Sequence, residues 1–175
     1  MLMIVPSKEH LINIKQVLNG WFDMKDLGPA KSILSMEIIR DCQRGTLQLR
    51  QLGQIRALLR DFNMVNCKPV MTPMSHNLNL CKRSTSVEDL KRPYCSLVGR
   101  LLYITMATRP DLTFTVCYLA RFSAGYDNTH WDALLRVLHY LQGTASLTIQ
   151  YSRDKTVYAK NGHMPYGRTT CICGC

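Results

Sequence analysis

Apolar residues in the first fifty positions change from helical spacing to the alternation typical of β-strands. After Ser7, a typical helix N-cap, they recur three or four residues apart, at Leu11, Ile14, Val17, Leu18 and Trp21. Gly28-Pro29 ends this helical region. A β-rich run then covers 33–39, and 46–51 alternates with period two after a polar turn at 41–45. The pattern predicts one helix followed by a β-hairpin.

The rest of the chain is marked by helix start and stop signals. Pro93 and Pro110 each suit the first turn of a helix, and Asp127 or Asn128 suits the N-cap of another. We expect, in order, a short helix over 55–62, a linker over 63–92, helices over 93–106, 110–122 and 128–143, and a strand over 147–151.

The order of these elements predicts an α+β fold, in which a β-hairpin precedes a bundle of helices. We divide the chain into a helix-and-hairpin unit (1–62), a linker (63–92) and a helical unit with a terminal strand (93–151). Residues 152–175 are polar and contain Gly and Cys without periodicity, so we expect a disordered tail. The hydrophobic content of 46% is enough to bury a core.

The chain is strongly basic: it has 22 Lys and Arg and 12 Asp and Glu, which gives a net charge of +10. Such an excess attracts polyanions, so nucleic acid is the expected partner; the alternative is a merely basic surface. The apolar start, 1–5, is too short for a signal peptide or a membrane span. We therefore expect a cytoplasmic or nuclear protein that is neither secreted nor bound to a membrane.

The eight cysteines are expected to be reduced thiols, since no export signal is present. Cys171, Cys173 and Cys175 could bind a soft metal with His163, but their spacing is tight and no folded knuckle supports them. We expect no metal and no cofactor in this chain.

No catalytic constellation is visible. Asp23 and Asp26 are the nearest carboxylate pair before the hairpin, and they flank a turn, where Asp commonly bonds the backbone. Two-metal phosphoryl transfer requires acids that converge on ions about 4 Å apart. Cys95 lies near a helix start without an obvious base, and there is no phosphate-binding Gly-rich loop.

One helix face is a better candidate for binding. Cys95, Gly99 and Tyr103 recur at i, i+4 and i+8, with Ser96 and Arg100 alongside. A glycine inside a helix costs about 1 kcal/mol relative to Ala, so a close approach of another surface is expected there. That surface is either the minor groove of a duplex or another helix, and helix geometry favours neither.

Segments along the chain resemble, in order, the reverse transcriptases of copia-type retrotransposons. They are 21–28 (WFDMKDLG), 34–38 (LSMEI), 67–73 (CKPVMTP), 93–99 (PYCSLVG), 108–111 (TRPD), 130–131 (HW) and 138–144 (LHYLQGT). The resemblance implies that the hairpin 32–51 is the primer grip at the palm edge, and that the following helices form a thumb-like bundle. The residues it places at an RNA–DNA or DNA duplex are Leu34, Ser35, Cys95, Gly99, Arg100 and Tyr103.

The chain also departs from that family. The catalytic aspartate pair, which binds Mg²⁺ in the family, would lie immediately before Met1, and 154–175 do not match the RNase H domain expected after Tyr151. Ser35 stands where the family usually has Gly. We therefore expect a truncated reverse transcriptase that binds template–primer weakly, in a salt-sensitive way, and does not polymerise DNA. The alternatives are a domesticated protein-interaction module using the exposed face of 93–122, a non-functional product of a decayed transposon, and a subunit that completes a polymerase in trans.

Overall fold

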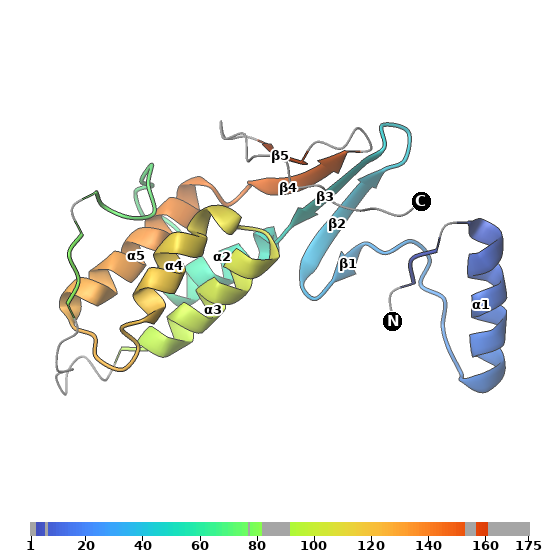
Figure 1. The fold of residues 1–175 in the computed structure, drawn as a ribbon, viewed down its shortest axis with the longest axis horizontal. Helices are drawn as coiled ribbons and strands as arrows, with labels where there is room; N and C mark the ends of the chain where they lie inside the picture. The colour runs from blue at the N-terminus through green and yellow to red at the C-terminus, as the bar shows by residue number, and fades with distance from the viewer. Residues whose placement is uncertain (1–2, 6, 77, 82–91, 153–156, 161–175) are drawn as a thin grey trace.

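The computed structural model describes residues 3–5, 7–76, 78–81, 92–152 and 157–160, the last four by their backbone alone. A bundle of helices and an antiparallel sheet lie end to end, and helix α1 lies beyond the sheet, at the far end from the bundle (Figure 1). The predicted α+β class is confirmed.

Helix α1 (Lys8–Trp21) begins where its N-cap predicts, because the Ser7 hydroxyl accepts the N–H of His10 at 3.3 Å. None of its residues is buried. The following loop is held by Asp26, which pairs with Lys15 at 2.6 Å and accepts the N–H of Gly28 at 2.9 Å. Asp26 thus has the turn-stabilising role expected of an Asp beside a glycine.

The sheet has five antiparallel strands in sequence order: β1 (Ser32–Ile33), β2 (Met36–Asp41), β3 (Thr46–Arg50), β4 (Thr148–Ser152) and β5 (Val157–Lys160). The run predicted as one strand over 33–39 is interrupted, since a two-residue turn of Leu34 and Ser35 separates β1 from β2. The predicted hairpin is β2–β3.

The C-terminal strand β4 is confirmed, and it pairs with β3, with Tyr151 opposite Leu47. One sheet therefore combines a strand from the predicted 93–151 unit with the hairpin of the predicted 1–62 unit. Strand β5 pairs with β4 in a segment for which no regular structure was predicted. The remainder of the predicted disordered tail, 153–156 and 161–175, lies outside the described residues.

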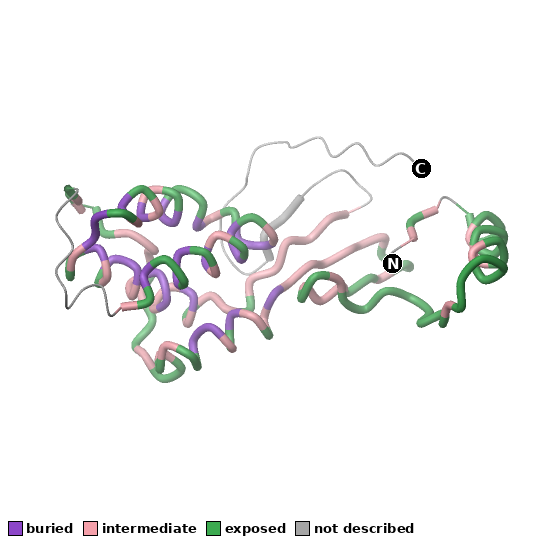
Figure 2. The backbone as a smooth tube through the Cα atoms, turned by 90° about the horizontal axis from the view of Figure 1, so that it is seen from below, coloured by how far each residue is buried: buried purple, intermediate pink, exposed green. Residues whose placement is uncertain are grey.

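The bundle contains α2 (Leu52–Asp61), α3 (Tyr94–Ala107), α4 (Thr113–Ala120) and α5 (Asn128–Gly143), with a 3-10 turn (Pro110–Leu112) before α4. Its core is formed mainly by Ile55, Leu58, Leu59, Tyr94, Leu97, Leu101, Ile104, Val116, Leu119, Leu134, Val137, Leu138 and Leu141. Figure 2 shows that burial is concentrated in this bundle, whereas the sheet strands are mostly half-buried. Among the described helices, none has the length and apolar character needed to cross a membrane.

Candidate nucleic-acid interface

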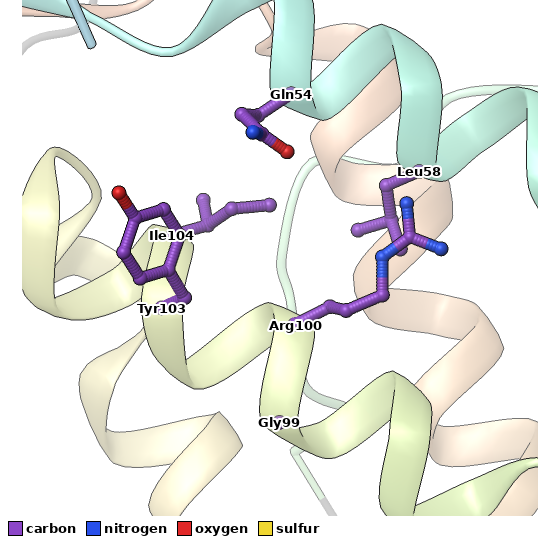
Figure 3. A pocket seen from close by; sticks show the side chains of 6 residues that line it. All are labelled: Gln54, Leu58, Gly99, Arg100, Tyr103 and Ile104. Atoms are coloured by element: carbon purple, nitrogen blue, oxygen red, sulfur yellow. The ribbon is translucent and has the colours of Figure 1, made fainter. Parts of the chain in front are cut away.

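Helices α2 and α3 border a pocket of about 210 Å³ on the surface of the bundle (Figure 3). Its lining residues, two from α2 and four from α3, are Gln54, Leu58, Gly99, Arg100, Tyr103 and Ile104. Pockets that enclose small ligands begin at roughly 300 Å³. The α2–α3 pocket therefore suits contact with the edge of a larger partner better than enclosure of a small molecule.

The turn between β1 and β2 is joined to this pocket by Tyr103. The Tyr103 hydroxyl donates a hydrogen bond to the carbonyl oxygen of Leu34, which lies 69 residues earlier in the chain. The Leu34 side chain is 71% exposed, and Ser35 is exposed beside it. The structure thus places the predicted hairpin residues next to the predicted face of α3.

The backbone of this turn explains which residue types suit it. Leu34 has a φ of 47° and Ser35 a φ of 61°, both in the left-handed region, and Ile33 lies opposite Met36. A two-residue hairpin turn with positive φ at both positions is type I′, which favours Gly and Asn. The site of Ser35 therefore favours glycine on steric grounds, because the left-handed region penalises a Cβ.

Gly99 lies on the exposed face of α3, and a Cβ built on it meets no described atom within 4 Å. Close packing of another helix of the bundle against Gly99 is therefore not the reason for this glycine. The space in front of Gly99 is open on the exposed face of α3.

Arg100 carries the positive charge of the pocket, and that charge is paired. Its Nη1 lies 2.7 Å from Oδ2 of Asp61, at the end of α2, and both side chains are at least one-third exposed. Exposed ion pairs contribute about 0–1 kcal/mol, so Arg100 can exchange Asp61 for another anion at small cost.

Cys95 lies one turn before Gly99 and does not line the pocket. Its thiol donates to the carbonyl oxygen of Ser123, after α4, over 3.6 Å. The predicted set is therefore divided. Gly99, Arg100 and Tyr103 line the pocket, and Leu34 is joined to it through Tyr103, with Ser35 beside Leu34 in the turn. Cys95 instead faces the end of α4.

The described residues do not form a metal site: no three His, Cys, Asp or Glu side chains among them gather to hold an ion. Two of the described acids are paired with cations of this chain. Asp26 pairs with Lys15 and Asp61 with Arg100. The cysteines at 171, 173 and 175 lie outside the described residues.

Two segments that carry the resemblance, 108–111 and 130–131, do not line the pocket; Arg109 and His130 are buried in the bundle. Arg109 is 1% exposed and donates to both oxygens of Asp111, at 2.9 and 2.7 Å. Burial opposes ionisation of Asp111, but the Arg109 hydrogen bonds and charge outweigh it and lower its pKa. His130 forms a capping box with Asp127 at the start of α5.

Comparison with known proteins assigns the chain to a family. Residues 1–76 match the reverse transcriptase (RNA-dependent DNA polymerase) family. The chain is 41% identical over 150 residues to the retrovirus-related Pol polyprotein from transposon TNT 1-94 of Nicotiana tabacum. The aligned region covers 82% of this chain and 11% of the polyprotein. No solved structure matches the chain.

Two shorter relatives cover a similar region. A Ty5-1 transposon protein of Saccharomyces cerevisiae is 29% identical over 168 residues, which is 93% of this chain and 54% of the yeast protein. An uncharacterized mitochondrial protein of Arabidopsis thaliana is 32% identical over 148 residues, which is 82% of this chain and 58% of that protein. The chain belongs to the reverse transcriptase family. Within it, the chain corresponds to a part of the Pol polyprotein of copia-type retrotransposons.

Proposed function

We propose that this chain binds the template–primer duplex of a retrotransposon reverse transcriptase. The β1–β2 turn and the exposed face of α3 act together in this proposal, as primer grip and thumb. The observation that carries it is the Tyr103–Leu34 hydrogen bond, because it joins two predicted contact regions from distant parts of the sequence. The net charge of +10 supports a polyanionic ligand.

Gly99 gives the second support. A helix glycine with open space in front of it lets a rigid partner approach the backbone of α3 closely. Arg100 and Tyr103, on the same face, supply a cation for phosphate and a flat ring for the sugar or base edge. The sugar–phosphate backbone of a duplex presents the charge and the continuous edge that this face suits.

We infer that the chain contributes binding rather than chemistry, and that the acids and Mg²⁺ of the polymerase reaction come from another part of the polyprotein. The described carboxylates support this, since Asp26, Asp61 and Asp111 are each paired with a cation of this chain. Primer extension is then expected only when an upstream segment of a copia-type polymerase is added. Extension by this chain alone would contradict the inference.

Fluorescence anisotropy with a labelled RNA–DNA hybrid tests the binding proposal. We expect log Kd to rise linearly with log salt, and Arg100→Glu to weaken binding and reduce the salt slope by about 1. The matched control is Arg56→Glu, an exposed arginine of α2 that does not line the pocket, with the same change of charge. Equal losses in the two variants would show that only net charge matters.

A second candidate function rests on exposed apolar side chains of α3 and α4. Met106 on α3 is 86% exposed, and Phe114 on α4 is 69% exposed. Exposed apolar side chains mark a site for a protein partner when they form one contiguous patch. Pull-down of one protein that resists salt and is lost in Met106→Ser together with Phe114→Ser would favour this function, provided that hybrid binding is absent.

A further inference from the structure

The sheet and the helical bundle are connected by two chain crossings within the described residues. Strand β3 leads into α2 through Gln51, and α5 leads into β4 through Thr144 and the three residues after it. The sheet extends from one end of the bundle (Figures 1 and 2). The bonds at these crossings therefore govern the angle between the two parts.

Two consecutive residues that follow α3 form hydrogen bonds to the two crossings, one residue to each crossing. The Thr108 hydroxyl donates to Oε1 of Gln51 at 2.8 Å. Arg109 donates from Nη1 to the carbonyl oxygen of Thr144 at 3.0 Å, and from Nη2 to its hydroxyl at 2.8 Å. One short segment thus holds both connections to the sheet.

This segment is itself rigidly held. The buried guanidinium of Arg109 is bidentate to Asp111, and the Tyr140 hydroxyl donates to the same carboxylate at 3.0 Å. Arg109 also lies 5.5 Å from the ring centroid of Tyr140. Planar, bidentate pairs of this kind fix geometry as well as charge.

We propose that Thr108 and Arg109 are positioning residues, which fix the sheet relative to the bundle and so set the spacing between the β1–β2 turn and the face of α3. This inference rests on the proposed binding of a duplex. A duplex is stiff, so an interface made of two parts binds well only if their spacing is set beforehand. Tyr103, on the same helix end, adds a third tie to the sheet through Leu34.

Distance measurements on the full chain test this role directly. Spin labels carried by unnatural amino acids at Gln43, in the β2–β3 turn, and at Ala124, after α4, span the two parts. Pulsed EPR should give a narrow distance distribution for the unmodified sequence. Thr108→Val and Thr144→Val, which keep side-chain shape and remove one hydroxyl each, should broaden it.

Arg109→Lys separates positioning from charge, because a single ammonium keeps the charge but cannot bridge Asp111 and Thr144 together. We expect a broadened distribution and a hybrid Kd raised about tenfold, mainly through faster dissociation. Val137→Ala, in the bundle core, is the control: it should lower Tm and leave the distribution narrow.

Variant distributions as narrow as that of the unmodified chain would overturn the positioning role. Equal broadening in Val137→Ala would overturn it too, because the residues would then act only through general stability. If the unmodified chain does not bind the hybrid, the proposed function fails, and the distance distributions still decide the positioning role. If Arg109→Lys does not fold, the two valine variants decide.

Discussion

Replacing Gly99 with alanine adds one methyl group, which should change the stability of the chain and its binding of a duplex in opposite directions. Gly99 lies inside α3, its φ is not in the left-handed region, and an added Cβ meets nothing within 4 Å. Alanine should therefore stabilise the helix by about 1 kcal/mol. For a chain of this length that corresponds to a rise in Tm of about 2–4 °C.

The same methyl group should weaken duplex binding. If the partner approaches the backbone at Gly99 as proposed, the added Cβ occupies the contact surface. Inserting a methyl group into a close contact costs about 1–2 kcal/mol, which weakens binding roughly 5- to 30-fold. Gly99→Leu should weaken it further while the bundle remains folded.

Differential scanning fluorimetry and hybrid anisotropy, run on the same preparations, measure the two effects. Gly53→Ala is the matched control, because Gly53 is also helical, exposed and free of contacts, but does not line the pocket. It should leave the hybrid Kd unchanged. A Gly99→Ala chain that is more stable and binds the hybrid as tightly as before would refute the reasoning, since the glycine would then serve no contact.

Three further predictions concern single side chains. Ser35→Gly should raise Tm by about 2–4 °C, because it relieves a left-handed residue at a cost near 1 kcal/mol; a lower Tm by fluorimetry would mean that the Ser35 side chain stabilises the turn. Asp61→Asn should release Arg100 and tighten hybrid binding about 2- to 5-fold by anisotropy, with less than about 1 kcal/mol lost in stability; unchanged binding would place Arg100 outside the interface. The pKa of Asp111 lies below its ordinary value of 3.8 in the folded chain, so its contribution to stability is complete above about pH 5 and is lost as the pH falls through the native pKa. Urea unfolding of Asp111→Asn against pH should be flatter below about pH 5, and an unchanged slope would contradict the pairing with Arg109.

Local signals predicted most of the secondary structure. Ser7 and Asp127 begin α1 and α5 because their side chains accept the first free N–H groups of each helix. Pro93 occupies the N-cap of α3, next to its first residue. These features depend on residues within a few positions of one another, so the sequence alone is enough to find them.

Other features depended on contacts that sequence patterns do not encode. The sequence pattern predicts a continuous strand through the β1–β2 turn, because neither Leu34 nor Ser35 is the Gly or Asn that a type I′ turn favours, although both adopt positive φ. The pairing of Arg100 with Asp61 connects two helices whose packing the sequence did not specify. The division of the predicted contact set, with Cys95 turned toward Ser123, likewise follows from how α3 packs on α4.

The segment 108–111 is one of those that carry the resemblance to reverse transcriptases, yet its chemistry is that of an internal support. Pro110 begins a 3-10 turn, which brings the carboxylate of Asp111 back onto Arg109 two residues earlier. A buried guanidinium needs this carboxylate and the oxygens of Thr144 at once, so the order Thr-Arg-Pro-Asp has a structural reason. The proposed contact surface needs much less: a missing side chain at Gly99 and a nearby cation. A binding face of this kind leaves a weak pattern in the sequence, whereas the support that holds it in place leaves a strong one.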